Sequence, residues 1–434
     1  MSGVTNIGVV NNDKLTVNGD VAGTINKGRR VAGAVDVLIL TALREEYEAA
    51  KEAVSTAWQE RDGRTSAPYV TGSHAGLSIA LARATGPGGR TLASLATTLV
   101  LRLRPRCLAM SGVCAGDPGA TAPGDVVVAD PAYEYDEGKH TGGRFLGDHR
   151  HYPQDTRWLR AVQEFDPAGL PSHGAATEDE SAVWLLERLL RGQDAREHPA
   201  RSRYFPRGTW GTRLDTLEEL GFIVRRAGDC ALTGTGRAMI EQRLARDVDG
   251  PQTLPFAVLA GPMASGSAVI QDERIWSTLG GLGVRKILGL EMEAATIATV
   301  AHEREVPHWL VAKGVMDNAN VEKDDRFKRF AARASAEVLF ALLGQVLAPP
   351  IPAPPAVLIP ADVRLRFTQR LAFDWQDLAD LVGVPAFERA GFAHGDEPRA
   401  LWEWLEVRGR LADLPGALAD IGRADLGDRL RPYL

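Results

Sequence analysis

The chain has 434 residues, of which 44% are hydrophobic and 24% are charged, and this composition is typical of globular proteins and excludes wholesale disorder. At about 150 residues per domain, the length predicts roughly three units. The net charge of -6 gives no global attraction to nucleic acid, and no apolar stretch approaches the roughly 18 residues that span a bilayer. We therefore expect neither nucleic acid nor a membrane as a partner, and a cytoplasmic location.

The three cysteines, Cys107, Cys114 and Cys230, are too far apart in the sequence to form a zinc knuckle or a redox pair. We expect reduced thiols that are mostly buried. No cluster of metal-ligating residues is visible, so we expect neither a metal site nor a cofactor.

The first 30 residues form a short leader in which small and β-branched residues alternate with Asn, Asp and Gly. This alternation over residues 4–25 predicts brief strands joined by tight turns. Such a piece cannot hold a core alone. Pairing with copies of itself in an oligomer, packing on the next domain and an unstructured leader all remain open.

The main domain, residues 31–347, begins with strand-to-helix units. The buried strand VDVLIL from Val35 runs into a helix over 43–54, and a second strand over 77–82 precedes a helix over 91–103. The glycine-rich turn ATGPGGR joins this second pair. Gly88 there permits close approach of a ligand, and Arg90 at the helix N-terminus favours an anion, although many such turns are glycine-rich for steric reasons alone.

Two further segments of small residues follow predicted strands. The strand 107–110 ends in SGVCAGDPGA, which contains Cys114 and Ala115, and the strand 256–259 ends in AGPMASGSAVI, which contains Met263. Small residues at a strand's carboxyl end leave room for a flat ring or simply form a tight turn.

Residues 150–250 interrupt this strand rhythm with helices rich in Leu and Arg, which indicates an insertion. Residues 208–245 contain a helix, a turn at Gly221, a two-strand ribbon and a closing helix, an order that resembles a winged-helix module. The expected core face of its first helix is Leu214, Leu217 and Leu220. Its acidic residues favour a packing or regulatory role over DNA binding.

The stretch 286–320 places two acidic positions at strand ends. Glu291 and Glu293 follow a strand over 287–290 and precede a helix over 294–302, while Asp317 follows the apolar strand 309–315, which is interrupted by Lys313. In an open parallel sheet the carboxyl ends of the strands form the ligand crevice. The alternative is that these acids merely cap the next helix.

The proline-rich segment 348–362 contains six prolines and predicts an extended linker. Beyond it, residues 363–434 predict a small all-α bundle. The expected core consists of Phe367, Leu371, Phe373, Trp375, Leu378, Leu381, Trp402, Leu405 and Leu414. Its acids and arginines suit pairing with a partner or are simply a solvated face.

Four of these segments together resemble the nucleoside phosphorylase and nucleosidase superfamily, especially its methylthioadenosine/S-adenosylhomocysteine nucleosidases. They are LTALREEYEAA, MSGVCAGDPGATAPGDVVVAD, LEMEAATIA and KGVMDNAN, and they cover roughly 35–147 and 255–346. Val113 and Met316 stand where these hydrolases usually have Ser. The C-terminal bundle, through DWQDLADL, resembles the effector-associated, death-like domains that are fused to nucleosidases in bacterial conflict proteins.

The resemblance implies an α/β fold with a phosphorylase-like mixed sheet flanked by helices, and a role for each acid. Glu46 would order the attacking water, Met292 and Glu293 would hold the ribose hydroxyls, and Asp317 would protonate the purine. Glu291 is a possible second ribose contact. A departing base must be protonated, and burial can keep a carboxyl group protonated for that task. Arg90 and Lys313 would be the donors to any phosphate groups.

The expected function is hydrolysis of the purine–ribose bond of a nucleotide, ATP among them, or of a nucleoside, in a bacterial defence effector whose C-terminal domain binds a protein partner. Metabolic methylthioadenosine/S-adenosylhomocysteine nucleosidase, purine nucleoside phosphorylase and inactive nucleotide-sensing scaffold are the alternatives. We also expect a homo-oligomer, as is common in this superfamily.

Overall fold

The computed structural model describes residues 34–347 and 359–433, apart from 62, 64, 65, 227, 228, 248, 285, 321–324, 390, 408 and 409. The expected β-rich leader, and all but residues 359–362 of the expected linker, lie outside the described residues. The chain divides into two compact units, Met1–Leu347 and Ala348–Leu434.

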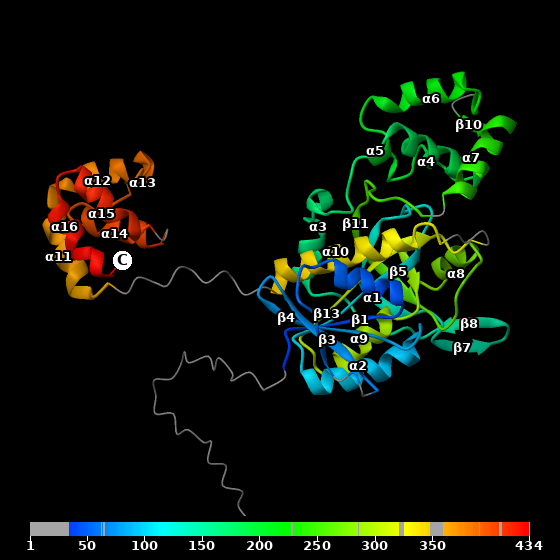
Figure 1. Cartoon of the computed structure of the whole chain (residues 1–434), viewed down its shortest axis with the longest axis horizontal. Coiled ribbons are helices and arrows are strands. Elements are labelled where there is room, and N and C mark those ends of the chain that lie inside the picture. The colour runs from blue at the N-terminus through cyan, green and yellow to red at the C-terminus, as the bar shows by residue number, and fades with distance from the viewer. Residues whose placement is uncertain are drawn as a thin grey trace, which may run out of the picture. The chain divides into compact units, whose positions relative to one another are not determined.

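The first unit is built on a nine-stranded mixed sheet in the order β12-β11-β6-β13-β5-β1-β4-β3-β2 (Figure 1). The strands are β1 Val37–Thr41, β2 Gln59–Arg61, β3 Tyr69–His74, β4 Leu77–Arg83, β5 Cys107–Gly116, β6 Val126–Glu134, β11 Val258–Ser265, β12 Gly289–Glu291 and β13 His308–Asp317. β1 lies parallel to β4 and β5, β13 is parallel to β5, and β11 is parallel to β6 and β12. β12 also pairs antiparallel with β5. Five strands therefore close on themselves, which confirms the expected mixed sheet.

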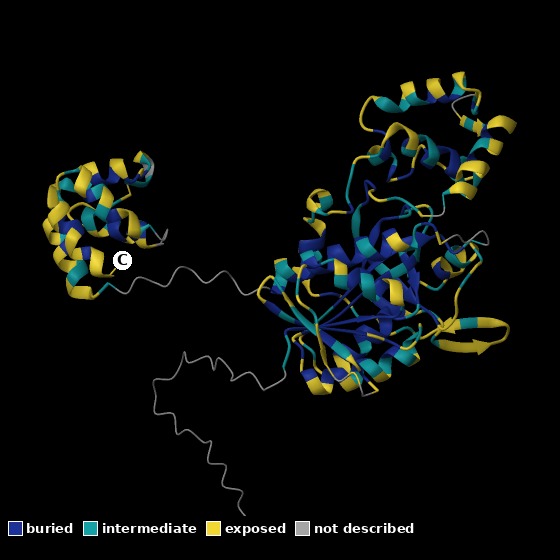
Figure 2. Ribbon diagram, in the orientation of Figure 1, coloured by how far each residue is buried: buried dark blue, intermediate teal, exposed yellow. Residues whose placement is uncertain are grey.

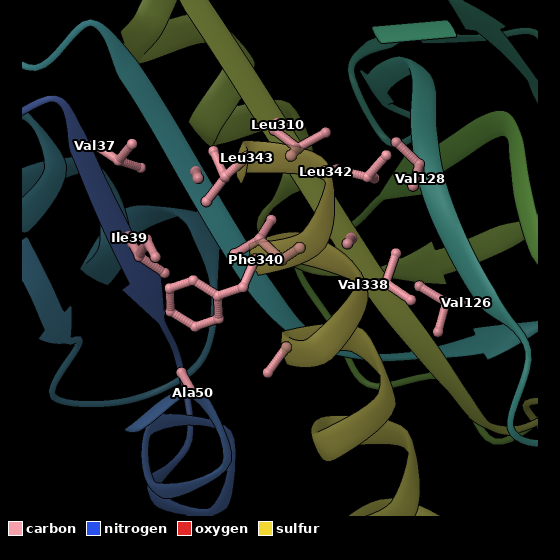
Figure 3. Packing of buried hydrophobic residues seen from close by; sticks show 14 of the residues in the cluster. Val37, Ile39, Ala50, Val126, Val128, Leu310, Val338, Phe340, Leu342 and Leu343 are labelled. Carbon is pink, nitrogen blue, oxygen red and sulfur yellow. The ribbon is translucent and has the colours of Figure 1, made fainter. Parts of the chain in front are cut away.

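Helices cover both faces of this sheet, and this explains why its central strands are apolar runs rather than alternating ones. One face carries α1 (Arg44–Glu52), α3 (Thr156–Gln163) and α10 (Lys328–Leu347), and the other carries α2 (Gly89–Leu103) and α9 (Ala294–Glu303). In Figure 3, Phe340 and Leu343 of α10 lie over Ile39 and Val37 of β1. Figure 2 shows the central strands as the most deeply buried part of the unit. A short helix, α8 (Ile275–Gly281), follows β11.

The helix α10 corrects the expectation about apolar stretches. It has 20 residues and a mean hydropathy of 1.4 in its most apolar window, so by length and composition it is able to cross a membrane. However, 72% of that window is buried inside the unit. Its alanines and leucines face the sheet and α1, and burial in a protein core explains the same composition.

Two strands extend further than the sequence predicts. β5 continues from the expected 107–110 to Gly116, and β11 begins at Val258 and continues to Ser265. The first parts of the two segments of small residues, 111–116 and 260–265, therefore belong to strands, and only the remainders lie outside them. Two exposed strands, β7 (Gly138–Thr141) and β8 (Arg144–Gly147), form a hairpin that we did not predict.

The insertion has its own small core. It contains η1 (Pro167–Gly169), α4 (Glu178–Leu190), α5 (Arg201–Tyr204), α6 (Thr209–Glu219), the ribbon β9 (Ile223–Arg226) and β10 (Asp229–Leu232), and α7 (Gly234–Arg246). Figure 1 shows α4 to α7 grouped together, in green. The order of helix, turn, ribbon and helix agrees with the sequence, but the winged-helix resemblance itself stays a prediction.

The prediction that Leu220 belongs to the core of the insertion is wrong. Leu214 and Leu217 are buried, whereas Leu220 is 56% exposed. Leu220 is the C-cap of α6, where the chain turns at Gly221 with a φ of +72°, so its side chain leaves the inner face of the helix.

The bidentate pair between Arg203 and Asp125 joins the insertion to the sheet.

The second unit is all-helical, as expected. Its helices are α11 (Ala361–Leu371), α12 (Trp375–Leu381), α13 (Ala386–Arg389), α14 (Glu397–Val407), α15 (Leu414–Asp420) and α16 (Ala424–Leu430), with 3₁₀ turns η2 (Ala372–Asp374), η3 (Leu411–Asp413) and η4 (Arg431–Tyr433). The core contains Phe367, Leu371, Leu378, Trp402, Leu405 and Leu414.

Two residues that the apolar pattern assigned to this core lie outside it. Phe373 is 94% exposed, because η2 breaks the helical register between α11 and α12. Leu381, the last residue of α12, is 51% exposed, and Trp375 is only half-buried against the cluster.

Candidate active site

A cavity of about 480 Å³ opens at the carboxyl ends of β1, β12 and β13. Segments that are distant in the sequence line it: the start of α1, the carboxyl end of β5, the segment after β11, and the ends of β12 and β13. Its lining is Ala42, Leu43, Glu46, Pro87, Val113, Cys114, Ala115, Ala268, Val269, Ile270, Gln271, Leu290, Glu291, Met292, Glu293, Met316, Asp317, Asp325 and Lys328.

Glu46 lies in the first turn of α1 and is 3% exposed. Its Oε2 accepts hydrogen bonds from the backbone N–H groups of Ala42 (2.9 Å) and Leu43 (2.8 Å), and its Oε1 accepts one from Val113 (3.0 Å). A Cβ at Gly112 would lie 2.4 Å from Oε1, so only glycine leaves room for the carboxylate. The carboxylate is therefore held rigidly at the cavity wall.

Lys313 lies behind the cavity on β13 and is 0% exposed. Its Nζ is 3.0 Å from Oε2 of Glu291 and 3.0 Å from Oε2 of Glu293. Burial lowers the pKa of a lysine, but Glu293, Glu291 and Glu46 outweigh burial and raise the pKa of Lys313 well above its ordinary value. Lys313 is thus a permanent buried cation that neutralises part of an acidic cluster.

Glu293 is ionised at one side of the cavity. Its Oε1 accepts a 2.7 Å hydrogen bond from the backbone N–H of Gly88, and its Oε2 accepts one from Lys313. Burial opposes this charge, yet Lys313 and the Gly88 N–H hold the pKa of Glu293 below its ordinary value. A carboxylate of this kind can accept hydrogen bonds from hydroxyl groups.

Glu291 has a structural task. Its oxygens accept hydrogen bonds from Ser265 Oγ (2.6 Å) and from the backbone N–H groups of Glu293 (2.9 Å) and Ala294 (2.9 and 3.0 Å). These N–H groups begin α9, so Glu291 caps that helix and also holds Lys313. It orients Glu293 rather than offering a free oxygen to a ligand.

Asp317 ends β13 at a β-bulge. The pairing with β5 shifts between Val315 and Asp317, and consequently the adjacent residues Met316 and Asp317 both line the cavity instead of facing opposite sides. The Asp317 Oδ1 accepts a 2.8 Å hydrogen bond from the Ala319 N–H. The next residue, Asn318, donates from Nδ2 to the Gly116 carbonyl oxygen (2.7 Å).

The structure thus brings seven of the eleven predicted site residues to the cavity wall. These are Glu46, Cys114, Ala115, Glu291, Met292, Glu293 and Asp317. Cys114 is buried, and burial raises the pKa of its thiol, so it contributes shape rather than a nucleophile.

Four predicted residues do not line the cavity. Gly88 acts through its N–H on Glu293, and its φ of +103° suits glycine. Lys313 lies behind Glu291 and Glu293. Met263 is fully buried in the core beneath α9. Arg90 is exposed on the first turn of α2.

Sequence reasoning missed the mouth of the cavity. Residues 268–271 line it, as do Asp325 and Lys328, whose Nζ lies 3.6 Å from Glu45 Oε1. No periodic pattern marks these positions, because they lie after a strand and before a helix. In the described lining, five carboxylates stand against one cation, Lys328, so the cavity is strongly acidic. Among the residues with described placement, no group of three or more His, Cys, Asp or Glu is arranged to hold a metal ion.

A known protein family matches the second unit. Residues 361–432 match the family model of bacterial death-like domain 3, which confirms the death-like resemblance of the C-terminal bundle.

The remaining similarities are more distant. The chain is 27% identical over 251 residues to the uncharacterised protein y4jS of Sinorhizobium fredii, a match that covers 56% of this chain and 44% of that protein. Solved structures of methylthioadenosine/S-adenosylhomocysteine nucleosidase are also similar. The Neisseria meningitidis enzyme with methylthio-immucillin-A has 16% identity and a TM-score of 0.44 over 71% of this chain and 98% of that one. The Streptococcus pneumoniae enzyme with MT-ImmA has 19% identity and a TM-score of 0.44 over 71% and 98%.

Proposed function

We propose that the first unit is an N-glycosidase that hydrolyses the bond between a purine and ribose. The observation that carries this proposal is the convergence of Glu46, Glu293 and Asp317, from three separate strand-to-helix junctions, on one cavity. Their surroundings differ, since Glu46 is held by backbone N–H groups, Glu293 by a buried lysine, and Asp317 by the turn after a bulge. Three differently held acids suit three different tasks.

The reaction breaks the C1′–N9 bond, and the bonding electrons leave with the purine. Asp317 donates a proton to the departing base, and the ribose becomes oxocarbenium-like. Glu293 accepts hydrogen bonds from the ribose hydroxyls and stabilises this positive charge. Glu46 takes a proton from the water that attacks C1′. The products are a neutral purine and free ribose.

The acidic lining of the cavity limits the phosphate groups that a substrate can place in it. The excess of carboxylates over cations in the lining disfavours free phosphate and also the phosphate chain of a nucleotide, and neither Arg90 nor Lys313 offers a donor in the cavity. We therefore infer that water is the attacking group and that the recognised unit is the purine ribonucleoside. The phosphates of an ATP-type substrate would extend past the mouth, where Lys328 lies. Apolar lining from Leu43, Val269 and Ile270 favours a methylthioadenosine-type substrate as the second candidate.

A chromatographic assay of free-base release tests the proposal. Methylthioadenosine, S-adenosylhomocysteine, adenosine, AMP and ATP are each incubated with the full chain, with and without inorganic phosphate. We expect purine release that phosphate does not accelerate. Failure of every compound to release base, with nucleotide binding retained, would instead support an inactive sensing scaffold.

The pH dependence of this activity follows from Glu46, which must be ionised to accept a proton. Burial has the largest influence on its pKa and raises it above the ordinary 4.5, while Lys313 and the Leu43 N–H oppose the rise. The ionised fraction falls as the pH falls through this raised pKa, so kcat/KM should decrease by about tenfold per pH unit below it. A pH profile of kcat/KM with an acid-side midpoint above 4.5 is the expected result.

Glu46→Gln should lose most of this activity, whereas Glu52→Gln on the exposed side of the same helix should keep the wild-type profile. An acid-side midpoint at or below 4.5 in the wild-type protein would contradict this role of Glu46.

We further propose that the death-like domain binds a protein partner and thereby controls base release in bacterial defence, in a cytoplasmic homo-oligomer. The match of residues 361–432 to a bacterial death-like domain supports the partner, and the arginine–carboxylate pairs on its surface, such as Arg364 with Glu403, are suited to charge-complementary pairing. Light scattering of the full chain tests the oligomer. Base release measured with and without a co-expressed death-like protein tests the control.

A further inference from the structure

A second cavity, of about 580 Å³, lies between the insertion and the sheet. α4, α7 and the segment before α10 form its walls, and we call it the arginine cavity after Arg188, Arg191, Arg243, Arg246 and Arg326, which line it. Its volume is in the range of cavities that hold small-molecule ligands. The bidentate Arg203–Asp125 pair and the buried Glu337, which accepts from Ser172 N (2.9 Å) and Oγ (2.8 Å), fix the insertion against the sheet. These contacts hold the walls of the cavity together.

Arg188 is a buried cation on this wall, and no carboxylate among the described residues forms an ion pair with it. It is 4% exposed, and its guanidinium lies 5.0 Å from the ring centroid of Trp184. Its Nη2 donates to the Pro118 carbonyl oxygen (2.6 Å). Burial lowers its pKa to about 10, partly opposed by Glu187, so it stays charged at neutral pH. A buried charge without a counter-charge is costly, and a bound anion would offset that cost.

Two other arginines share one carboxylate. Glu187, buried on α4, accepts from Arg191 Nη2 (2.7 Å) and from Arg326 Nη2 (2.8 Å). Arg326 also lies 3.6 Å from Asp247, and Arg243 pairs with Asp179. Glu180 is occupied by its capping interaction with Thr177. The described lining holds five arginines and four carboxylates. This balance is opposite in sign to that of the cavity of the candidate active site, which we call the reactive cavity.

The arginine cavity adjoins the reactive cavity. Asn318, which follows the proton donor Asp317, lines it. A small void of about 10 Å³ is lined by Glu187 and Arg191 from the insertion together with Met316 and Asp317 from β13. This void shares Glu187 and Arg191 with the arginine cavity and Met316 and Asp317 with the cavity of the candidate active site. A ligand in the arginine cavity would therefore lie next to Asn318, the neighbour of Asp317.

We propose that the arginine cavity is a second binding site, for a phosphate-bearing small molecule that regulates the chain and is not its substrate. Guanidinium groups form charge-assisted and often bidentate hydrogen bonds with phosphate oxygens. Arg188 supplies a buried charge that forms no ion pair with a described carboxylate, Arg246 is exposed, and Phe327 offers an apolar surface. The arginine cavity would thus bind phosphate groups beside the reactive cavity, whose carboxylates disfavour them.

Isothermal titration calorimetry of the full chain tests the proposal, with inorganic pyrophosphate and UTP as probes. Neither probe offers a purine to the reactive cavity, and binding is read without turnover, so the result does not depend on the proposed N-glycosidase activity. Binding of pyrophosphate means that phosphate alone suffices, and binding of UTP only means that the nucleoside is needed as well. Both outcomes support the site, whereas binding of neither probe overturns it.

Variants locate the binding. Arg188→Gln should weaken binding by about tenfold or more, and Arg246→Ala, which is exposed and safe for folding, by about two- to fivefold. The matched control is Arg237→Ala, an exposed arginine on the same helix α7 that does not line the cavity, and it should bind as the wild type does. Wild-type affinity in both Arg246→Ala and Arg188→Gln would contradict the assignment.

Discussion

Asp317→Asn is expected to reduce kcat for purine release by about a hundred- to ten-thousandfold, the usual contribution of a general acid. The amide cannot give a proton to the departing base, so the purine would have to leave as an anion. Asn keeps an oxygen that can accept the Ala319 N–H hydrogen bond that Asp317 Oδ1 accepts at 2.8 Å, so the turn after the bulge should persist. The measurement is kcat by chromatography of the free base, with the melting temperature as a check on folding.

Asp325→Asn is the matched control for this variant. Asp325 also lines the cavity, but it is exposed at the mouth, so the same substitution should change kcat by less than about threefold. Retention of wild-type kcat in Asp317→Asn would remove the general acid from the mechanism.

Lys313→Met is expected to destabilise the first unit by about 3–5 kcal/mol, because it leaves a buried acidic cluster without its cation. Lys313 lies 3.0 Å from both Glu291 and Glu293, and its charge also opposes the rise in the pKa of Glu46. Methionine fills a similar volume, so the loss is electrostatic rather than a cavity effect. Urea unfolding of the full chain at pH 7 measures it.

The pH dependence of this loss has a definite sign. The pKa of Glu293 is lowered in the folded protein, so its stabilising contribution is present above the unfolded value near 4.5 and disappears as the pH falls through the folded pKa. Without Lys313 that contribution is lost, and the two proteins should therefore differ less in strong acid than at pH 7. Lys51→Met removes a surface pair with Glu48 (3.9 Å) and the cation–π contact with the Tyr47 ring (5.6 Å), and should cost less than about 1 kcal/mol. A loss for Lys313→Met as small as that for Lys51→Met would contradict the account of the cluster.

The strand-to-helix junctions of the site were predictable from the sequence. Apolar runs that end abruptly in polar residues, before Glu46 and again before Glu293, mark the carboxyl ends of buried strands, where ligands bind. The all-helical second unit was predictable for the same reason, since its apolar positions recur with helical spacing. The exceptions, Leu220, Phe373 and Leu381, lie at helix ends or in a turn, where that spacing no longer determines which side chain faces inward.

Features that depend on tertiary pairing were not predictable. The bulge that turns both Met316 and Asp317 into the cavity arises from the register between β13 and β5, which a single strand does not encode. Likewise, the sequence gives no sign that Lys313, which lies in an apolar strand, neutralises Glu291 and Glu293. Lys313 is on β13 and the two glutamates are at the end of β12, and only the closed sheet brings them together. The arginine cavity exists only because the insertion packs against the sheet.

The most direct test of the central claim is to follow a purine ribonucleoside cleaved by the wild-type chain in H₂¹⁸O without phosphate. Mass spectrometry of the products should show unlabelled free purine and ribose that carries one ¹⁸O at C1. Absence of free purine from every nucleoside and nucleotide offered, or a sugar product without the label after correction for exchange, would contradict hydrolysis at this site.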